Sequence, residues 1–332
     1  MARNPQRIFS GIQPTGAKHL GNYSGGFRQY VATQEQGEAF FCIVDLHSIT
    51  VEHDPALLRR TTFDLAAMLL ATGVDPRRST VFVQSHVTAH SEAAWLLSAI
   101  TSYGQLGRMT QFKDKAEHHA FVSASLFTYP VLMAGDILLY QTDVVPIGDD
   151  QRQHLELTRD VAQRFNLRFG ETFRLPEGRY PQEGARIMDL QEPSRKMSTT
   201  GGTPLGTVLI TDPPDVLRQK FKSAVTDSDR EIRHDRTDKP GLSNLIEILA
   251  VARDRSIQQV EREFDGQGYG VLKEAVGEAV VKLLTPIRER YEAVRADEAE
   301  MVRQLGLGAA KARSASAPTL HAMYDRMGFV RR

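Results

Sequence analysis

The chain has 332 residues, which is enough for a full hydrophobic core and for two domains. Its composition, 41% hydrophobic and 25% charged, is typical of a soluble globular protein, and no apolar stretch approaches the ~20 residues that a membrane-spanning helix needs. The formal charge of zero gives no sign of a nucleic-acid partner. The single cysteine, Cys42, excludes an internal disulfide. Because the residues after Met1 also lack the apolar core of a signal peptide, we predict a cytoplasmic protein.

The first predicted element is a strand at residues 8–10, followed by a turn rich in Gly, Pro and Thr. The sequence His19-Leu20-Gly21-Asn22 then opens a helix predicted over residues 20–36. A Gly-rich turn between strand and helix brings backbone N–H groups and a helix dipole onto an anion, which favours a phosphate or nucleotide site. It is neither a dinucleotide fingerprint nor a P-loop. An ordinary turn shaped by Pro and Gly is the alternative.

Strand and helix signals continue to alternate along the first half of the chain. Further strands are predicted at residues 39–44, 80–84 and 144–147, with helices at 55–72, 91–101, 129–140 and 152–165. The strands are nearly continuous apolar runs, which is typical of parallel strands buried on both faces. We therefore predict an α/β fold, a doubly wound parallel sheet (Rossmann-like) that binds ligands at the carboxyl ends of its strands.

The second half of the chain is predicted to be helical. After a turn-rich loop at residues 199–204, helices are expected at 214–222, 241–251, 256–264 and 273–294. A Ser/Ala-rich stretch at 309–318 is expected to precede a final short helix. This pattern predicts a second, all-helical domain.

Three other segments carry candidate chemistry. The first is Arg195-Lys196-Met197-Ser198-Thr199, where a lysine on a mobile loop would neutralise charge on a leaving pyrophosphate. A merely basic loop is the alternative.

The second segment, residues 129–140, places Tyr129, Met133, Asp136 and Tyr140 on one helix face by their spacing of four, three and four. A carboxylate among apolar side chains needs a donor, and an indole N–H, which is a donor only, suits it. A salt bridge from Asp136 to an arginine is the competing interpretation.

The third segment, residues 145–151, ends a predicted strand in a Gly turn and the carboxylates Asp149 and Asp150. These suit ribose hydroxyls, a substrate ammonium or Mg²⁺, or simply a cap of the next helix. His47 follows the strand at 39–44 and is also expected at the crevice, although a structural histidine is the commoner case.

Together these segments resemble the class I aminoacyl-tRNA synthetases, whose two nucleotide-gripping elements are named HIGH and KMSKS after their sequences. The match is closest to the bacterial tryptophanyl-tRNA synthetases and runs from Ile8 to about Val294. It includes the segments at residues 9–16, 129–138, 148–151, 220–227 and 239–245.

The resemblance implies a role for each matching position. The tryptophan-binding residues would be Phe9, Gly11, His47, Tyr129, Met133, Asp136, Val145, Ile147 and Gln151, with Asp136 accepting the indole N–H. Those binding ATP, which would carry Mg²⁺, would be Gln13, Gly21, Asn22, Gly148, Asp150, Ile187, Lys196, Met197 and Ser198. Catalytic roles would fall to Lys196, Lys115, Asn22 and Gln13, and no structural metal is expected.

The resemblance also implies the domain plan and the partners. Residues 1–196 would form the catalytic domain, with a C-terminal helix at about 300–332 packing back on it. Residues 197–299 would form a helical domain that binds the anticodon of tRNA(Trp), and the enzyme would be a homodimer.

One departure concerns the mobile loop, where the family has a second lysine and this chain has Thr199. Losing an ammonium that contacts pyrophosphate weakens transition-state stabilisation by a few kcal/mol unless another cation, such as Arg195, Lys113 or Lys115, replaces it.

The expected reaction is ATP-dependent activation of L-tryptophan and its transfer to tRNA(Trp). The alternatives are a tyrosyl-tRNA synthetase, a small-molecule nucleotidyltransferase, and a non-catalytic paralogue whose loop has decayed.

Overall fold

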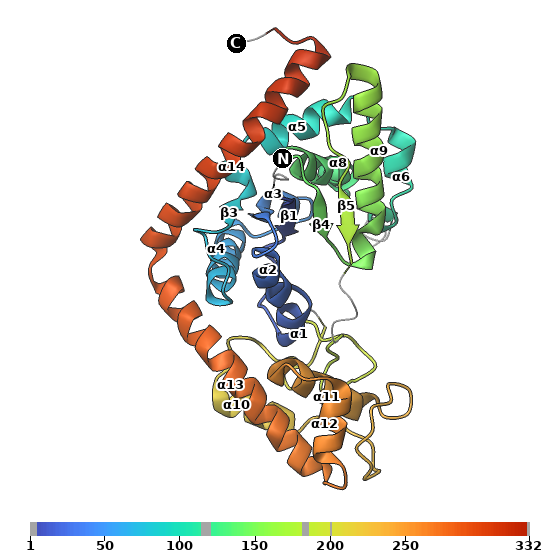
Figure 1. The fold of residues 1–332 in the computed structure, drawn as a ribbon, viewed down its shortest axis with the longest axis vertical. Coiled ribbons are helices and arrows are strands. Elements are labelled where there is room, and N and C mark those ends of the chain that lie inside the picture. The colour runs from blue at the N-terminus through green and yellow to red at the C-terminus, as the bar shows by residue number, and fades with distance from the viewer. Residues whose placement is uncertain (1–4, 114–120, 181–185, 200, 331–332) are drawn as a thin grey trace.

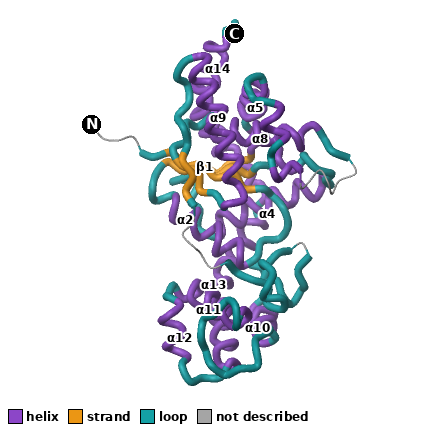
Figure 2. The backbone as a smooth tube through the Cα atoms, turned by 90° about the vertical axis from the view of Figure 1, so that its right-hand side faces the viewer, coloured by secondary structure: helices purple, strands orange, loops and turns teal. Residues whose placement is uncertain are grey.

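A computed structural model describes residues 5–113, 121–180, 186–199 and 201–330. Its centre is a parallel five-stranded sheet in the order β3-β2-β1-β4-β5 (Figure 2). The strands are β1 (Arg7–Ile12), β2 (Glu38–Ile43), β3 (Thr80–Val83), β4 (Val144–Pro146) and β5 (Glu177–Arg179). The four predicted strands are confirmed with small shifts of their ends. Sequence reasoning missed β5, because Glu-Gly-Arg has no apolar run.

The β2 strand sends alternate side chains into two hydrophobic clusters on opposite faces of the sheet. Phe40 and Cys42 belong to one cluster, while Phe41 and Ile43 belong to the other. Burial on both faces explains the unbroken apolar strand sequences. Cys42 is fully buried, and burial raises the pKa of its thiol well above the ordinary value, as expected for a packed cysteine.

The helices of the sheet part match most of the predicted ones. They are α1 (Leu20–Asn22), a π-helical turn (Tyr23–Phe27), α2 (Arg28–Thr33), α3 (Asp45–Ser48), α4 (Pro55–Ala71), a 3₁₀ turn (Gln84–His86), α5 (Ala89–Ser98), α6 (Tyr103–Gly107), α8 (Ala124–Leu138), a 3₁₀ turn (Asp149–Gln151) and α9 (Arg152–Phe169). The α4 helix begins as its sequence predicts, since Asp54 Oδ1 accepts the N–H of Ala56 at 2.8 Å and Pro55 occupies the first helical position.

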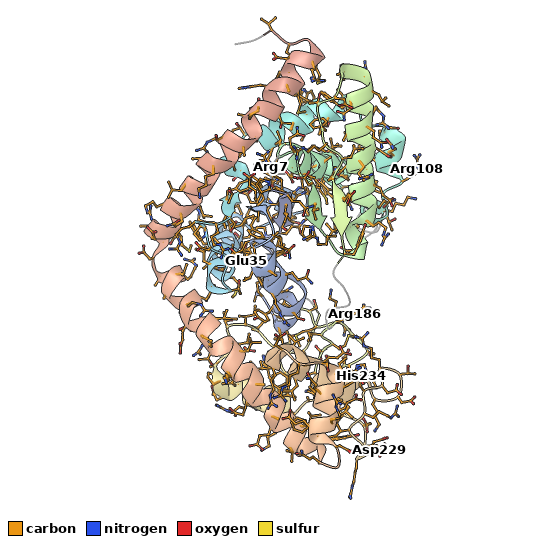
Figure 3. The ribbon with its side chains drawn as sticks, viewed as in Figure 1. Arg7, Glu35, Arg108, Arg186, Asp229 and His234 are labelled. Carbon is orange, nitrogen blue, oxygen red and sulfur yellow. The ribbon has the colours of Figure 1, made fainter. Side chains whose placement is uncertain are left out.

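The helical part consists of α10 (Pro214–Lys222), α11 (Pro240–Arg253), α12 (Ile257–Phe264) and α13 (Tyr269–Ala296). It forms the lower lobe in Figure 1, and α13 rises from it to pack against α4. Arg186 lies where the chain enters this part, and His234 lies within it (Figure 3). His234 Nε2 contacts the buried Glu247 Oε1 at 2.7 Å.

The C-terminal helix corrects one prediction. Residues 309–318 do not precede a short helix but lie inside α14 (Glu298–Met327), a single helix along the sheet part (Figure 1). Small side chains let this helix lie directly on β3: a Cβ at Gly308 would stand 1.8 Å from the Val81 carbonyl oxygen. Leu305 joins one core cluster and Ala309 the other, so α14 crosses the edge of the sheet. Tertiary packing, rather than composition, decides this segment.

None of the helices in the described ranges is both long and apolar enough to cross a membrane.

Candidate functional site

A cavity of about 380 Å³ opens at the carboxyl ends of β1 and β4, where the strand order reverses direction. Such a switch point is where open α/β sheets bind ligands. Each residue that the resemblance assigned to the tryptophan pocket lines this cavity, as do Gln13, Gly148 and Asp150 of the predicted ATP set. The prediction that Tyr129, Met133, Asp136 and Tyr140 share one helix face is confirmed for the first three, which line the cavity from α8. It is wrong for Tyr140, which lies beyond the end of α8 at Leu138 and is not among the residues that line the cavity.

Asp136 is the buried carboxylate of this cavity, with 2% of its surface exposed. No arginine contacts it among the described hydrogen bonds, so the predicted alternative of an arginine salt bridge is wrong. Its Oδ1 instead accepts from Gln84 Nε2 at 2.7 Å and lies 2.6 Å from His90 Nδ1, while its Oδ2 lies 2.9 Å from His47 Nε2.

The charge of Asp136 is maintained by these contacts. Burial alone would raise the pKa of this carboxyl, but hydrogen bonds from His47 and His90 outweigh it and hold the pKa well below the ordinary value. A carboxylate has about four acceptor positions, and the three donors occupy three of them. Among the residues that the structure describes, no fourth donor to Asp136 is present, so one acceptor position remains for a donor inside the cavity.

Two more of the residues that line the cavity, Tyr129 and Gln151, make hydrogen-bonding contacts through their side chains. Tyr129 Oη lies 2.7 Å from His154 Nε2, and burial raises the pKa of the Tyr129 hydroxyl to about 12. Gln151 Nε2 donates to Asp150 Oδ2 at 2.7 Å. Gln151, the N-cap residue of α9, makes no capping hydrogen bond with its side chain, and Asp150 lines the cavity.

A second cluster forms where the turn before α1 meets the loop around Lys196. His19 pairs with Leu209 in a β-bridge, Met188 pairs with Lys196, and Met197 N–H donates to the Ile187 carbonyl at 3.1 Å. A Cβ on Gly21 would lie 3.7 Å from Ile187 Cβ. The fold thus brings together the two segments that the sequence analysis singled out about 175 residues apart.

His19 is the buried group between these segments. Burial lowers the pKa of its imidazole to about 4, assisted by the positive charges of Lys196 and Lys18. Its Nδ1 is buried and has no hydrogen-bond partner in the part of the chain that the structure describes. A buried polar atom without a partner, beside two lysines, fits a site whose remaining partner is an anionic ligand.

Thr199 and Arg195 flank Lys196 in this loop. The Thr199 hydroxyl lies 3.0 Å from where a Cβ on Gly16 would stand, so residue 199 faces the first turn. Arg195 donates to Glu192 Oε2 at 2.9 Å and to the Gly201 carbonyl at 3.1 Å. These bonds hold the Arg195 guanidinium within its own loop, which argues against it as the replacement for the missing lysine.

The remaining predicted site residues divide by location. Asn22 Oδ1 accepts the backbone N–H of His19 at 2.9 Å and so stabilises the turn. Lys196 is exposed and Ser198 is half-buried in the loop. Lys115 lies outside the described residues.

Sequence reasoning missed Gln84 and His90, the two side chains that contact Oδ1 of Asp136. Gln84 follows directly after β3, and its place at the carboxyl end of a predicted strand was a usable signal. His90 lies on α5, and no pattern in the sequence indicates that it faces Asp136. Gln111 and Val44, which also line the cavity, were missed too.

Comparisons with known proteins agree with this geometry. The family model for class I tRNA synthetases (W and Y) matches residues 1–285. A tryptophan–tRNA ligase of Caldanaerobacter subterraneus subsp. tengcongensis is 50% identical over 327 residues, 98% of this chain and 99% of the relative. Tryptophan–tRNA ligase 2 of Streptomyces avermitilis is 51% identical over 333 residues, 99% of each chain.

Solved structures give the same result. Tryptophanyl-tRNA synthetase from Mycoplasma pneumoniae is 38% identical, with a TM-score of 0.87 over 98% of both chains. The enzyme from Campylobacter jejuni, complexed with ADP and tryptophan, is 34% identical, with a TM-score of 0.85 over 98% of this chain and 100% of that chain. Tyrosyl-tRNA synthetase from Aeropyrum pernix, at 21% identity and a TM-score of 0.67 over 91% of this chain and 89% of that one, shows the fold alone.

Proposed function

The chain belongs to the class I tRNA synthetases for tryptophan and tyrosine, and we propose that it is an ATP-dependent tryptophan–tRNA ligase. It activates L-tryptophan to tryptophanyl-AMP with release of pyrophosphate and then transfers the aminoacyl group to tRNA(Trp). The observation that carries this choice of amino acid is Asp136, a buried, ionised carboxylate in the lining of the cavity with one acceptor position left by its described partners.

Tryptophan suits this carboxylate better than tyrosine does. The indole N–H only donates, and an acceptor held by three donors is its complement. A site built around one buried hydrogen bond rejects ligands that lack the matching group. Phe9, Met133 and Ile147 supply the apolar walls that an indole ring requires.

ATP occupies the adjoining cluster in this proposal. Gln13, Gly148 and Asp150 line the cavity, and His19 and Lys196 lie at the junction of the two segments. The orphaned His19 Nδ1 and the nearby lysines fit a triphosphate, with Mg²⁺ entering as part of the nucleotide substrate. We expect Ile187 and Met197 to flank the adenine.

The reaction follows from placing both substrates together. The tryptophan carboxylate attacks the α-phosphorus in line, the bond to the bridging oxygen breaks, and pyrophosphate leaves with the displaced charge. A ribose hydroxyl of the tRNA then attacks the activated carbonyl and AMP leaves. Lys196 is positioned to stabilise the leaving charge, so positioning and electrostatics do most of the catalysis.

The test is amino-acid-dependent ATP–pyrophosphate exchange on the purified protein, with tryptophan and with tyrosine, followed by charging of tRNA(Trp). We expect exchange with tryptophan only. Exchange with tyrosine alone would refute the proposal. Exchange with neither would favour the non-catalytic paralogue, for which Thr199 is the supporting residue, and an adenylate that never reaches tRNA would favour a nucleotidyltransferase.

Three further parts of the proposal concern organisation. Residues 197–299 form the anticodon-binding domain, residues 1–196 the catalytic domain, and α14 packs on the latter. Residues just after the proposed boundary still contact the catalytic domain, since the Leu20 N–H donates to the Val208 carbonyl at 2.8 Å.

The proposed site of action is the cytoplasm, where tRNA is charged.

The enzyme is proposed to be a homodimer through its catalytic domain. Trp95 on α5 and Tyr103 on α6 are each 80% exposed, which is unusual for large aromatic side chains on a monomer. Trp95 is the sole tryptophan in the sequence, so its fluorescence reports on this surface directly. Light scattering that gives a monomer mass of 37.1 kDa at micromolar concentration would refute the dimer.

A further inference from the structure

A chain of two buried hydrogen bonds leads from Asp136, which lines the cavity, to Tyr140, which does not. His90 Nδ1 lies 2.6 Å from Asp136 Oδ1, and His90 Nε2 lies 2.9 Å from the Tyr140 hydroxyl. His90 and Tyr140 are fully buried, and Asp136 is 2% exposed.

The elements that carry these residues are packed together independently of the chain of bonds. The α5 helix, which carries His90, lies between α8 and α14 (Figure 1). The Tyr140 ring also stacks on Phe9, with centroids 5.5 Å apart and planes at 17°. Tyr140 therefore supports both the apolar wall and the carboxylate of the cavity.

The positions of the protons determine how these hydrogen bonds act on the Asp136 carboxylate. An ionised Asp136 has no proton to give, so His90 Nδ1 donates to it and His90 Nε2 pairs with the Tyr140 hydroxyl. His90 and Gln84 both donate to Oδ1, while His47 contacts Oδ2. Donors on both oxygens fix the plane of the carboxylate and so fix the direction in which its free acceptor position points.

We propose that His90 and Tyr140 are positioning residues for tryptophan recognition, which orient the Asp136 carboxylate toward the indole N–H from outside the cavity. This inference rests on the proposed function. Neither residue lines the cavity, so both act through Asp136 and the packing around it. Without His90, one donor to Oδ1 is lost, and Asp136 can rotate or take up a proton and present an O–H to the indole.

The test compares two substrates in ATP–pyrophosphate exchange: tryptophan, and its analogue with sulfur in place of the indole N–H (3-benzothienylalanine). We expect His90→Gln to raise the KM for tryptophan about tenfold and Tyr140→Phe about threefold. The KM for the analogue, which offers no N–H, should stay within twofold, and kcat should change little for either substrate.

Tyr324→Phe is the matched control. The Tyr324 hydroxyl on α14 donates to Glu92 Oε2 on α5, the helix of His90, at 2.8 Å, so its removal breaks another tyrosine hydrogen bond to α5 without touching Asp136. We expect the ratio of the two KM values to be unchanged in this variant. Circular dichroism melting of each variant checks folding, and if His90→Gln fails to fold, Tyr140→Phe decides the question because it removes one oxygen atom only.

Two results would overturn the inference. Equal losses for tryptophan and the analogue mean that the residues serve packing alone, and unchanged KM values in Tyr140→Phe and His90→Gln mean that Asp136 needs no such support. An unmodified enzyme without tryptophan-dependent exchange overturns the proposed function and this inference together, whereas an active enzyme with equal losses overturns the inference alone.

Discussion

Two glycines of α14 are expected to respond in opposite ways to alanine. Gly306 is exposed, and a Cβ there meets nothing within 4 Å, whereas a Cβ at Gly308 would stand 1.8 Å from the Val81 carbonyl oxygen. Both lie in a helix interior, where alanine gains about 1 kcal/mol over glycine. Gly306→Ala should therefore raise the free energy of unfolding by about 1 kcal/mol.

Gly308→Ala should lower the free energy of unfolding despite the same propensity gain. Contacts below 3.0 Å are essentially never observed for a Cβ, so α14 must move off β3 by roughly 1 Å or more. A gap of that size loses a quarter to a half of the van der Waals attraction along the contact, and overpacking costs about 1–3 kcal/mol or more. We expect a net loss of about 2 kcal/mol, so that the two variants differ by about 3 kcal/mol.

Urea unfolding followed by circular dichroism measures this difference through the transition midpoints. Gly306→Ala is the control for helix propensity, because it changes the same helix by the same atoms. A Gly308→Ala variant as stable as Gly306→Ala would show that α14 does not lie this close to β3, and would refute the packing argument.

The other predictions concern the site. Asp136→Asn keeps the side-chain shape but removes a charged acceptor worth about 1.5–3 kcal/mol, so kcat/KM for tryptophan should fall roughly 10- to 150-fold in pyrophosphate exchange; a normal value would mean that Asp136 does not contact the indole. Thr199→Lys should raise the exchange rate about tenfold or more at unchanged KM for tryptophan, whereas an unchanged rate would mean that another cation already serves the pyrophosphate. The pKa of His19 is lowered to about 4 in the folded protein, so its imidazole is neutral there at pH 7. Below pH 6.5 the unfolded state therefore binds more protons than the folded state, and the free energy of unfolding falls until about pH 4. Between pH 7 and 4.5 the unmodified protein should lose about 2–3 kcal/mol more stability to urea than His19→Asn does, and equal losses would contradict the assigned burial of His19.

The sheet was predictable from sequence because its strands are buried on both faces and therefore nearly uniformly apolar. By contrast, β5 gains its strand conformation from pairing with β4, and its residues Glu177–Arg179 carry no signal of their own. The sequence pattern predicted only a short last helix, because the serines and Pro318 of residues 309–318 favour a helix break, whereas the resemblance placed a helix at about 300–332, close to the observed α14. The close approach of Gly308 to β3 explains why small residues are needed there.

The site shows the same division. Helical spacing placed Asp136 on the correct face, since that property is local to one helix. The partners of Asp136 come from α3, from the turn after β3 and from α5, and no local pattern encodes a meeting of three separate segments. Thr199 was evident as a departure in the sequence, but only the structure shows that Arg195 is already bonded within the loop.

The placement of α14 has a consequence for the order in which the protein is made. The ribosome releases all five strands before α14, and β3 is an edge strand of the sheet that α14 crosses at Gly308. While residues 298–327 are still unsynthesised, that edge is open to pairing with strands of other nascent chains. The growing chain therefore depends on α14 to close this edge against aggregation.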